Sequence, residues 1–244
     1  MFKNHVKHYF YVDACSVVDV SILKGACNLV ASKNRQKIVS EKDITKNDSL
    51  SLRPEVSKRL EEAVLDIFSN SDFHKANIRD VAKAAGVSFS TIYKHFGSKE
   101  QLVFTFVDIW LSKLTERIVD HLQGIENLKE KLRKVLWLQL DYYERNPHLG
   151  RIIFMTLPMA TWMADETFEQ KKMITLYLDV LKKGQEEGVL NSKVRAGILL
   201  DFMMGLVQRS FVMWVKRGGE GSLAAQANEL FEIVWCGITV SGGD

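Results

Sequence analysis

The sequence predicts an all-α protein in which a three-helix segment at residues 54–100 is followed by a larger helical body at residues 101–244. From Pro54 onward, apolar residues recur at steps of three and four, the period of an α-helix with one buried face. Glycine and proline residues interrupt this pattern at intervals, and no segment alternates apolar and polar side chains as a half-buried strand does. A chain of 244 residues is also long enough to bury two modest cores.

The composition is that of an ordinary globular protein, with 46% hydrophobic and 26% charged residues. A formal net charge of +3 is too small for a polybasic, histone-like protein, so any nucleic-acid surface must be local. The three cysteines are Cys15, Cys27 and Cys236, and no two of them form a CxxC pair. This excludes a disulfide framework and a zinc ribbon, and it fits a reducing, cytoplasmic location.

The N-terminal region has the general layout of a signal peptide, because the fairly apolar run 10–23 follows Lys3 and Lys7. Asp13 and Asp19 argue against that interpretation, since they interrupt a run that should carry no charge. No other segment has eighteen consecutive apolar residues, so no contact with a membrane is expected.

Residues 1–53 are expected to form an N-terminal extension that is poorly ordered or variable. The stretch from Ala31 to Arg53 is rich in Lys, Asn, Ser and Asp and has little periodicity, which is typical of a solvated linker. Whether residues 1–52 belong to the native protein stays open. They form either an authentic arm or an artefact of the assigned start, since the next methionine after Met1 is Met155.

The first helix of the three-helix segment is predicted to begin at Pro54 and to end near Ser69. Proline suits the first turn, where its missing N–H costs nothing, and Glu55 complements the positive end of the helix dipole. The apolar residues of this helix form one stripe: Val56, Leu60, Ala63, Val64, Ile67 and Phe68.

Residues 77–96 predict two short helices joined by a tight turn. Asn77 caps the first helix, Gly86 supplies the left-handed conformation that ends it, and Ser88 caps the second. Small alanines on the first helix permit a close, steep crossing, which projects the second helix toward a groove. The inward residues are Ile78, Val81, Ala82, Ala85, Val87, Ile92 and Phe96, and the outward ones are Phe89, Ser90, Thr91, Lys94 and His95.

This run resembles the DNA-binding region of the TetR family of transcription regulators. The family pattern has a helix cap, an Ile/Val-Ala-x-x-Ala-Gly-Val core and then Thr-x-Tyr-x-x-Phe-x-x-Lys. The sequence matches it with Asn77, then the core 81–87, then Thr91, Tyr93, Phe96 and Lys99. One departure is Ser90, where family members often carry glycine.

The resemblance implies a dimeric transcription regulator, a repressor by default, that binds a palindromic operator in double-stranded DNA. Tyr93 and Lys99 would clamp phosphates together with Asn77 or Arg79, and the outward side chains of the second helix would face base edges. The expected DNA-binding residues are Asn77, Arg79, Ser88, Phe89, Ser90, Thr91, Tyr93, Lys94, His95 and Lys99.

The remainder of the chain is predicted to be helical and, by resemblance, to bind an effector and to dimerise. Ser98 caps a long connecting helix that runs to about Leu122. The further helices are expected at about 127–145, 148–157, 165–187, 194–216 and 222–239, with breaks at Gly and Pro residues.

The helices at 194–216 and 222–239 are expected to form the homodimer interface. Residues 196–215 are apolar nearly all round, so that helix needs cover on more than one side. The alternative, a fully buried central helix in a monomer, stays open. By resemblance, two such helices from each subunit would form a four-helix interface.

Helices between 127 and 187 are where the family places an effector pocket, and this region is rich in methionine and aromatic residues. Such side chains form adaptable apolar cavities, so a small hydrophobic or amphipathic effector is expected. An ordinary core has the same composition. The candidate ligand-binding residues are Trp137, Tyr142, Phe154, Met155, Met159, Trp162, Met163, Tyr177 and Met203.

An enzyme is the competing class, but the sequence has no GxSxG, P-loop, HExxH or GxGxxG motif. His5, His8, Cys15 and Cys27 are irregularly spaced, so no metal site and no cofactor are expected. A further alternative is a helical interaction or ligand-binding protein without specific operator binding. The operator sequence, the effector and the target genes do not follow from the sequence.

Overall fold

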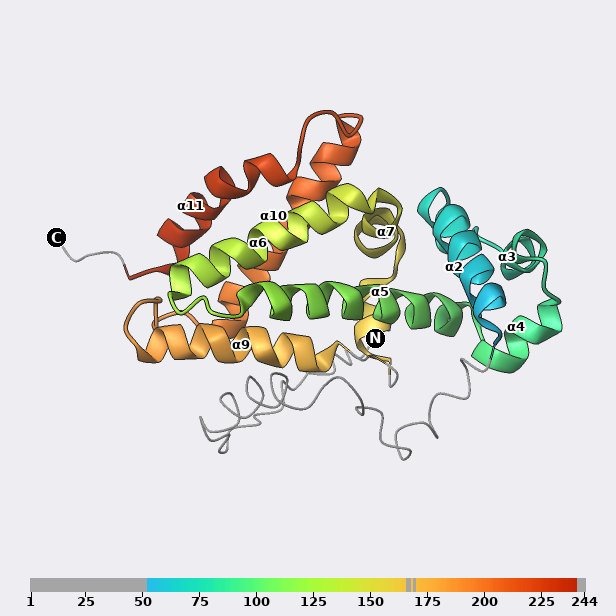
Figure 1. Cartoon of the computed structure of the whole chain (residues 1–244), viewed down its shortest axis with the longest axis horizontal. Coiled ribbons are helices and arrows are strands. Elements are labelled where there is room, and N and C mark those ends of the chain that lie inside the picture. The colour runs from blue at the N-terminus through green and yellow to red at the C-terminus, as the bar shows by residue number, and fades with distance from the viewer. Residues whose placement is uncertain (1–51, 166–167, 169, 241–244) are drawn as a thin grey trace, which may run out of the picture. The chain divides into compact units, whose positions relative to one another are not determined.

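The computed structural model describes residues 52–165, 168 and 170–240. The chain divides into two compact units, 1–48 and 49–244, and all described residues belong to the second unit. The N-terminal extension expected at residues 1–53 therefore lies almost wholly outside them. Within the described residues, every secondary-structure element is a helix or a turn of helix (Figure 1), apart from one isolated bridge between Leu190 and Thr239. The predicted all-α fold is confirmed.

Helices α2 (Pro54–Ser69), α3 (Ile78–Ala85) and α4 (Phe89–Phe96) pack at the N-terminal end of the long helix α5 (Lys99–Leu122). We call α2, α3 and α4 the head. Its core is built from the apolar stripe of each helix, and the fully buried residues are Leu60, Val64, Phe68, Val81 and Ile92. The head is thus held by the residues that the periodicity of the sequence predicted.

Local signals fix where the head helices begin and end. The backbone N–H of Arg79 donates to Asn77 Oδ1 (2.9 Å), and that of Thr91 donates to Ser88 Oγ (3.0 Å). Gly86 ends α3 with φ of 64°, a left-handed conformation that costs glycine little. Ser98 caps α5 by accepting a bond from the N–H of Gln101 (3.1 Å). All four residues act as the sequence predicted.

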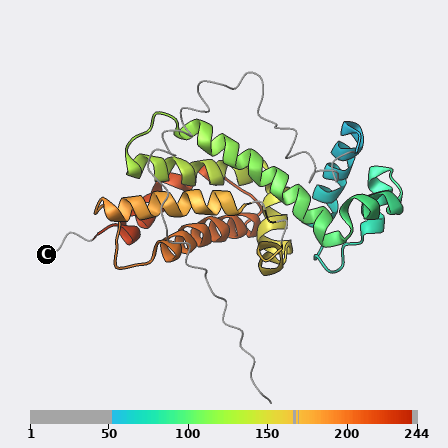
Figure 2. The ribbon, with the colours of Figure 1, turned by 90° about the horizontal axis from the view of Figure 1, so that it is seen from below.

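The body contains α5, α6 (Leu128–Arg145), α9 (Lys171–Glu186), α10 (Ala196–Lys216) and α11 (Ala227–Ile238), as Figures 1 and 2 show. Asn127 caps α6, and a turn of 3-10 helix, Ala224–Gln226, precedes α11. The helices predicted at 127–145 and 194–216 are confirmed to within two residues. The last predicted helix, 222–239, begins as the 3-10 turn.

The segment between α6 and α9 differs from the prediction of one helix at 148–157 and another beginning at 165. Helix α7 (Pro147–Arg151) changes into a π-helical turn (Ile152–Thr156), and a short helix, α8 (Met159–Met163), follows. Helix α9 begins only at Lys171, because Asp165 is held in a turn, where its Oδ2 accepts a hydrogen bond from Gln101 Nε2 (2.7 Å). The predicted start at residue 165 is therefore wrong.

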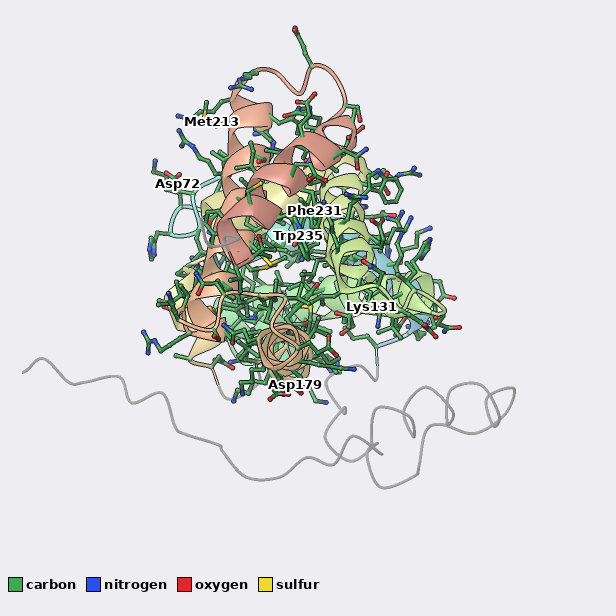
Figure 3. All side chains as sticks on the ribbon, turned by 90° about the vertical axis from the view of Figure 1, so that its left-hand side faces the viewer. Asp72, Lys131, Asp179, Met213, Phe231 and Trp235 are labelled. Carbon is green, nitrogen blue, oxygen red and sulfur yellow. The ribbon has the colours of Figure 1, made fainter. Side chains whose placement is uncertain are left out.

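Helix α11 is joined to α6 by an aromatic and ionic seam. Figure 3 shows Phe231 and Trp235 on the side of α11 that faces α6. The Arg133 guanidinium lies 5.1 Å from the centre of the Phe231 ring, and the Lys129 ammonium lies 5.4 Å from that of Trp235. Both cations also pair with Glu232, at 2.7 and 3.1 Å. This seam fixes α11 and leaves its other face outward.

Helix α10, with 21 residues, is long and apolar enough to cross a membrane by length and composition alone. This test is weak by itself, because an apolar helix of a soluble bundle passes it too. Only part of α10 is buried within the chain, on the side that carries Leu199, Met203, Val207 and Phe211.

Candidate nucleic-acid interface and effector region

The exposed face of α4 carries an aromatic pair. The ring centres of Phe89 and Tyr93, one turn apart, are separated by 4.5 Å, and their side chains are 38% and 44% exposed. The Arg79 guanidinium of α3 lies 5.5 Å from the centre of the Phe89 ring. Large exposed aromatic side chains beside a cation are typical of a surface that a partner covers.

Three hydroxyl groups meet at the N-terminal end of α4. Ser88 Oγ lies 2.8 Å from Ser90 Oγ and 2.7 Å from Thr91 Oγ1, and it also accepts the capping bond from the Thr91 N–H. Ser90, which stands where relatives often have glycine, is therefore tied to the helix cap. The cluster presents donors and acceptors beside the positive end of the helix dipole.

Lys94 is exposed and His95 is half-buried in the last turn of α4. With the hydroxyl cluster at the other end of the helix, they extend the polar surface along the whole of α4. A helix of eight residues with one polar, accessible face fits a major groove about 12 Å wide. The structure thus keeps every predicted base-facing side chain at least partly accessible.

An open depression of about 430 Å³ lies between the N-terminal ends of α3 and α5. Helix N-termini favour anions, because their first N–H groups lack partners within the helix and the dipole is positive there. The tyrosine of the aromatic pair borders this depression. Its lining residues are His74, Lys75, Ala76, Asn77, Ile78, Tyr93, Ser98, Lys99 and Glu100. The depression brings together Asn77, Tyr93 and Lys99, three of the residues predicted from the sequence to contact DNA phosphates.

Lys99 has a structural task in addition to the predicted phosphate contact. Its ammonium donates hydrogen bonds to the backbone carbonyls of Phe73 (2.8 Å) and Ala76 (3.3 Å), and it lies 4.8 Å from the centre of the Phe73 ring. These contacts attach the loop between α2 and α3 to the start of α5. One of the three ammonium hydrogens is left for a further acceptor.

The nine candidate effector residues occupy several different surroundings. Phe154 joins an aromatic cluster with Tyr143 and Phe211, whereas Met155 and Met163 are both 47% exposed. Trp137 lies beneath the cations of Arg117 and Lys134, and Trp162 packs edge-on against Phe168. The Tyr177 hydroxyl accepts a hydrogen bond from Gln139, and the Tyr142 hydroxyl donates one to the Trp110 carbonyl (2.8 Å). Of the remaining two candidates, Met203 is buried and Met159 is half-buried.

Sequence reasoning missed Gln139, a buried polar residue on α6. The missed signal was its position, because Gln139 continues the apolar stripe formed by Leu132, Val135, Leu136 and Tyr143. A glutamine at this position of the stripe is buried because of the face of the helix on which it lies, whichever groups it contacts. Its amide lies against Tyr177 of α9 and Met204 of α10.

Burial and ion pairing shift several pKa values in the body. Burial opposes the ionised form of Asp141, but hydrogen bonds from Arg117 (2.6 Å) and Arg145 (2.9 Å) outweigh it and lower the pKa of that carboxyl. Burial, with a smaller contribution from the charge of Glu61, raises the pKa of Tyr142 to about 12. The tyrosine hydroxyl is therefore neutral at physiological pH, and Asp141 is ionised.

An apolar surface is left outward on α10 and α11. Ile198 and Phe202 of α10 are 46% and 45% exposed, and Ile233 of α11 is 62% exposed. The Phe202 ring lies across Gly237, where an added Cβ would stand 3.4 Å from it. We call these four residues, with Leu206, the α10–α11 face.

The part of the chain that the structure describes contains no group of three His, Cys, Asp or Glu side chains placed to hold a metal ion. The four irregularly spaced metal candidates of the N-terminal region lie outside the described residues.

The exposed polar face of α4, held by capped helices beside an open depression, defines the class of protein: a helix-turn-helix DNA-binding transcription regulator. Two family models match the chain. "Bacterial regulatory proteins, tetR family" matches residues 62–105, and "YsiA-like protein, C-terminal region" matches 108–237, more than half of the 244 residues. The chain belongs to the TetR family, as the sequence motif predicted.

Individual relatives agree. The transcriptional repressor KstR2 of Mycobacterium tuberculosis is 26% identical over 74% of this chain and 92% of its own length. The fatty acid metabolism regulator protein of Bacillus subtilis is 21% identical over 72% and 92%. The solved structure of FadR from Bacillus subtilis, in complex with stearoyl-CoA, has a TM-score of 0.64 at 19% identity over 75% and 99%. These relatives are regulators, and the protein is not an enzyme.

Proposed function

We propose that the protein is a homodimeric, cytoplasmic repressor that binds a palindromic operator through α4 and is released by a small hydrophobic or amphipathic effector. The observation that carries the proposal is the accessible polar face of α4, in which the hydroxyl cluster of Ser88, Ser90 and Thr91 is continued by Lys94 and His95. The relative KstR2 is named a transcriptional repressor, which supports repression rather than activation.

The α10–α11 face supports the homodimer. Ile233 is 62% exposed and lies in an apolar surface that spans two helices. Monomeric proteins rarely leave such a surface in water, and a twofold copy of the same surface would cover it. A dimer presents two α4 helices, which is why the proposed operator is an inverted repeat.

The effector class is supported by the body and by a relative. Half-buried methionine and aromatic side chains line the inner sides of α6, α9 and α10, and such side chains repack around apolar ligands. The FadR structure of Bacillus subtilis holds stearoyl-CoA. We therefore propose an acyl thioester or a compound of similar apolar bulk.

The test measures binding of the full-length protein to the DNA upstream of its own gene by fluorescence anisotropy. The expected result is saturable binding that weakens steeply with salt and is reversed by octadecanoyl-CoA but not by CoA alone. Binding that does not distinguish this DNA from a shuffled duplex would contradict specific operator recognition. Binding that octadecanoyl-CoA and shorter thioesters leave unchanged would contradict the effector class.

A further inference from the structure

The body contains a buried amide group with an unused hydrogen-bonding atom. Gln139 is only 5% exposed, yet its Oε1 has no hydrogen-bond partner among the described residues. Its Nε2 donates to the Tyr177 hydroxyl (3.2 Å) and lies 3.8 Å from Met204 Sδ. Exchanging the amide oxygen and nitrogen would let Tyr177 donate instead, but would then leave the nitrogen unpaired. Either way, one amide atom lacks a partner.

An unpaired buried amide destabilises the ligand-free protein, because it loses its bonds to water and gains none in return. Leucine would fit the stripe of Leu132, Leu136 and Tyr143 without that cost. The glutamine at this position thus leaves one hydrogen-bonding atom available to a further group.

The surroundings of the amide are uncharged. Asp141, two residues along α6, points to a different side of the helix and is neutralised by Arg117 and Arg145. Burial raises the pKa of Tyr177 well above its usual value, so its hydroxyl stays neutral and acts as donor or acceptor. Such a site suits a neutral oxygen atom and disfavours a carboxylate or phosphate.

The helix that covers the amide lies at the surface of the body. Among the described side chains of α9, only Leu181 and Gly184 are buried, and Tyr177 is half-buried. The neighbouring Met173, which accepts a hydrogen bond from Thr115 (3.1 Å), and Met204 are flexible side chains that can move aside. Room for a ligand next to the amide thus requires side-chain rearrangement and no refolding of α6.

We propose that Gln139, paired with the Tyr177 hydroxyl, binds a neutral oxygen of the effector and so selects an apolar molecule that carries one. An effector hydroxyl would donate to the free Oε1, whereas an effector carbonyl would accept from Nε2 after the amide flips and Oε1 takes the bond from Tyr177. The inference rests on the proposed function of the body as an effector site. The oxygen has two possible sources: the ester carbonyl of an acyl thioester, or an oxygen on the hydrocarbon chain itself.

The first arm of the test needs no ligand. Thermal unfolding of full-length protein is compared for the parent, Gln139→Leu and the control Gln123→Leu, which replaces an exposed glutamine after α5. Gln139→Leu is expected to melt at the same temperature as the parent or higher. A melting temperature lower by more than about 3 °C, with no change in the control, would mean that the amide is a structural element and would overturn the proposal.

The second arm measures the affinity of the same proteins for octadecanoyl-CoA and for a series of hydroxy- and oxo-octadecanoyl-CoA thioesters. Gln139→Leu is expected to weaken binding by about tenfold. An equal loss for every thioester identifies the ester carbonyl as the bound oxygen, and a loss confined to oxygenated chains identifies the chain oxygen. Affinities within about twofold of the parent for the whole series would overturn the inference but not the proposed function. Failure of the parent to bind any thioester would overturn both the inference and the proposed effector class, but not the proposed operator binding.

Discussion

The two helices of the helix-turn-helix motif and the last three long helices of the body differ in how they begin. Helices α3 and α4 of the head, and α5 at their junction with the body, each begin with a side-chain cap, from Asn77, Ser88 and Ser98. Helix α6 of the body is also capped, by Asn127, whereas α2 of the head and α9, α10 and α11 of the body begin without a side-chain cap. A cap stabilises a helix by about 1 kcal/mol, so the head holds its recognition helix in one position with little help from a partner.

The body instead has an exposed apolar residue at its surface and unpaired polar atoms in its interior. Ile233 is exposed, Trp162 Nε1 and Gln139 Oε1 have no hydrogen-bond partners among the described residues, and only Leu181 and Gly184 are buried among the described residues of α9. The difference teaches that the two regions do different work. The head presents a preformed surface, whereas in the proposed function the body is completed by a second subunit and a ligand. Four variants test this comparison.

The largest effect is expected from Ile233→Asp, which places a carboxylate in the α10–α11 face. We expect the dimer to dissociate, because a charge buried in an apolar interface is costly, and operator affinity to fall by about 100-fold or more. Leu176→Asp is the control, since Leu176 of α9 is also exposed, at 45%, but lies off that face. For both variants, analytical sedimentation measures the oligomeric state and fluorescence anisotropy measures the affinity for the operator. A monomeric control or a dimeric Ile233→Asp would contradict the proposed interface.

Asp141→Asn is expected to destabilise the body by about 2 kcal/mol, because the amide replaces the ionised acceptor of Arg117 and Arg145. The folded-state pKa of Asp141 is lowered, so its contribution is present above about pH 4 and is lost as pH falls through the folded value. Urea unfolding at several pH values tests this. The control is Asp179→Asn, at an exposed position of α9 (Figure 3). Equal effects of the two variants would contradict the role of the ion pair.

Lys99→Met is expected to lower the free energy of unfolding by about 1.5 kcal/mol, because two backbone carbonyls lose their donor, and also to weaken DNA binding. Lys94→Met removes an exposed lysine of α4 and should weaken DNA binding without changing stability. Denaturation and anisotropy on the same samples separate the two roles. Unchanged stability of Lys99→Met would refute its structural task.

The smallest effect is expected from Tyr93→Phe. Its side chain is 44% exposed, so loss of the hydroxyl should leave the melting temperature unchanged. Removal of one phosphate contact should weaken binding by about 1 kcal/mol, equally for operator and unrelated DNA. A loss restricted to the operator would instead assign Tyr93 to base recognition.

The head could be predicted almost residue by residue, because its signals are local. Asn77, Gly86 and Ser88 act within a few residues of their own positions, so cap and turn chemistry sufficed. Lys99 shows the limit. Its bonds to carbonyls 23 and 26 residues away depend on how the α2–α3 loop packs against α5, which no local pattern reveals.

The body was predicted as helices but not in detail. Gly150 has no room for a Cβ, since the Phe211 ring of α10 would lie 2.3 Å from it, and the chain becomes π-helical at Ile152. That contact spans 61 positions of sequence, so the change from α- to π-helical geometry within the predicted helix could not be foreseen. Gln139 was visible in its stripe, but its pairing with Tyr177 required the placement of α9.

The most direct test of the central claim is selection of DNA by the purified full-length protein from a pool of random duplexes. The head and the α10–α11 face together predict enrichment of an inverted repeat with two equivalent half-sites, one for each α4. Enrichment of a sequence without twofold symmetry, or no enrichment over the starting pool, would contradict the account.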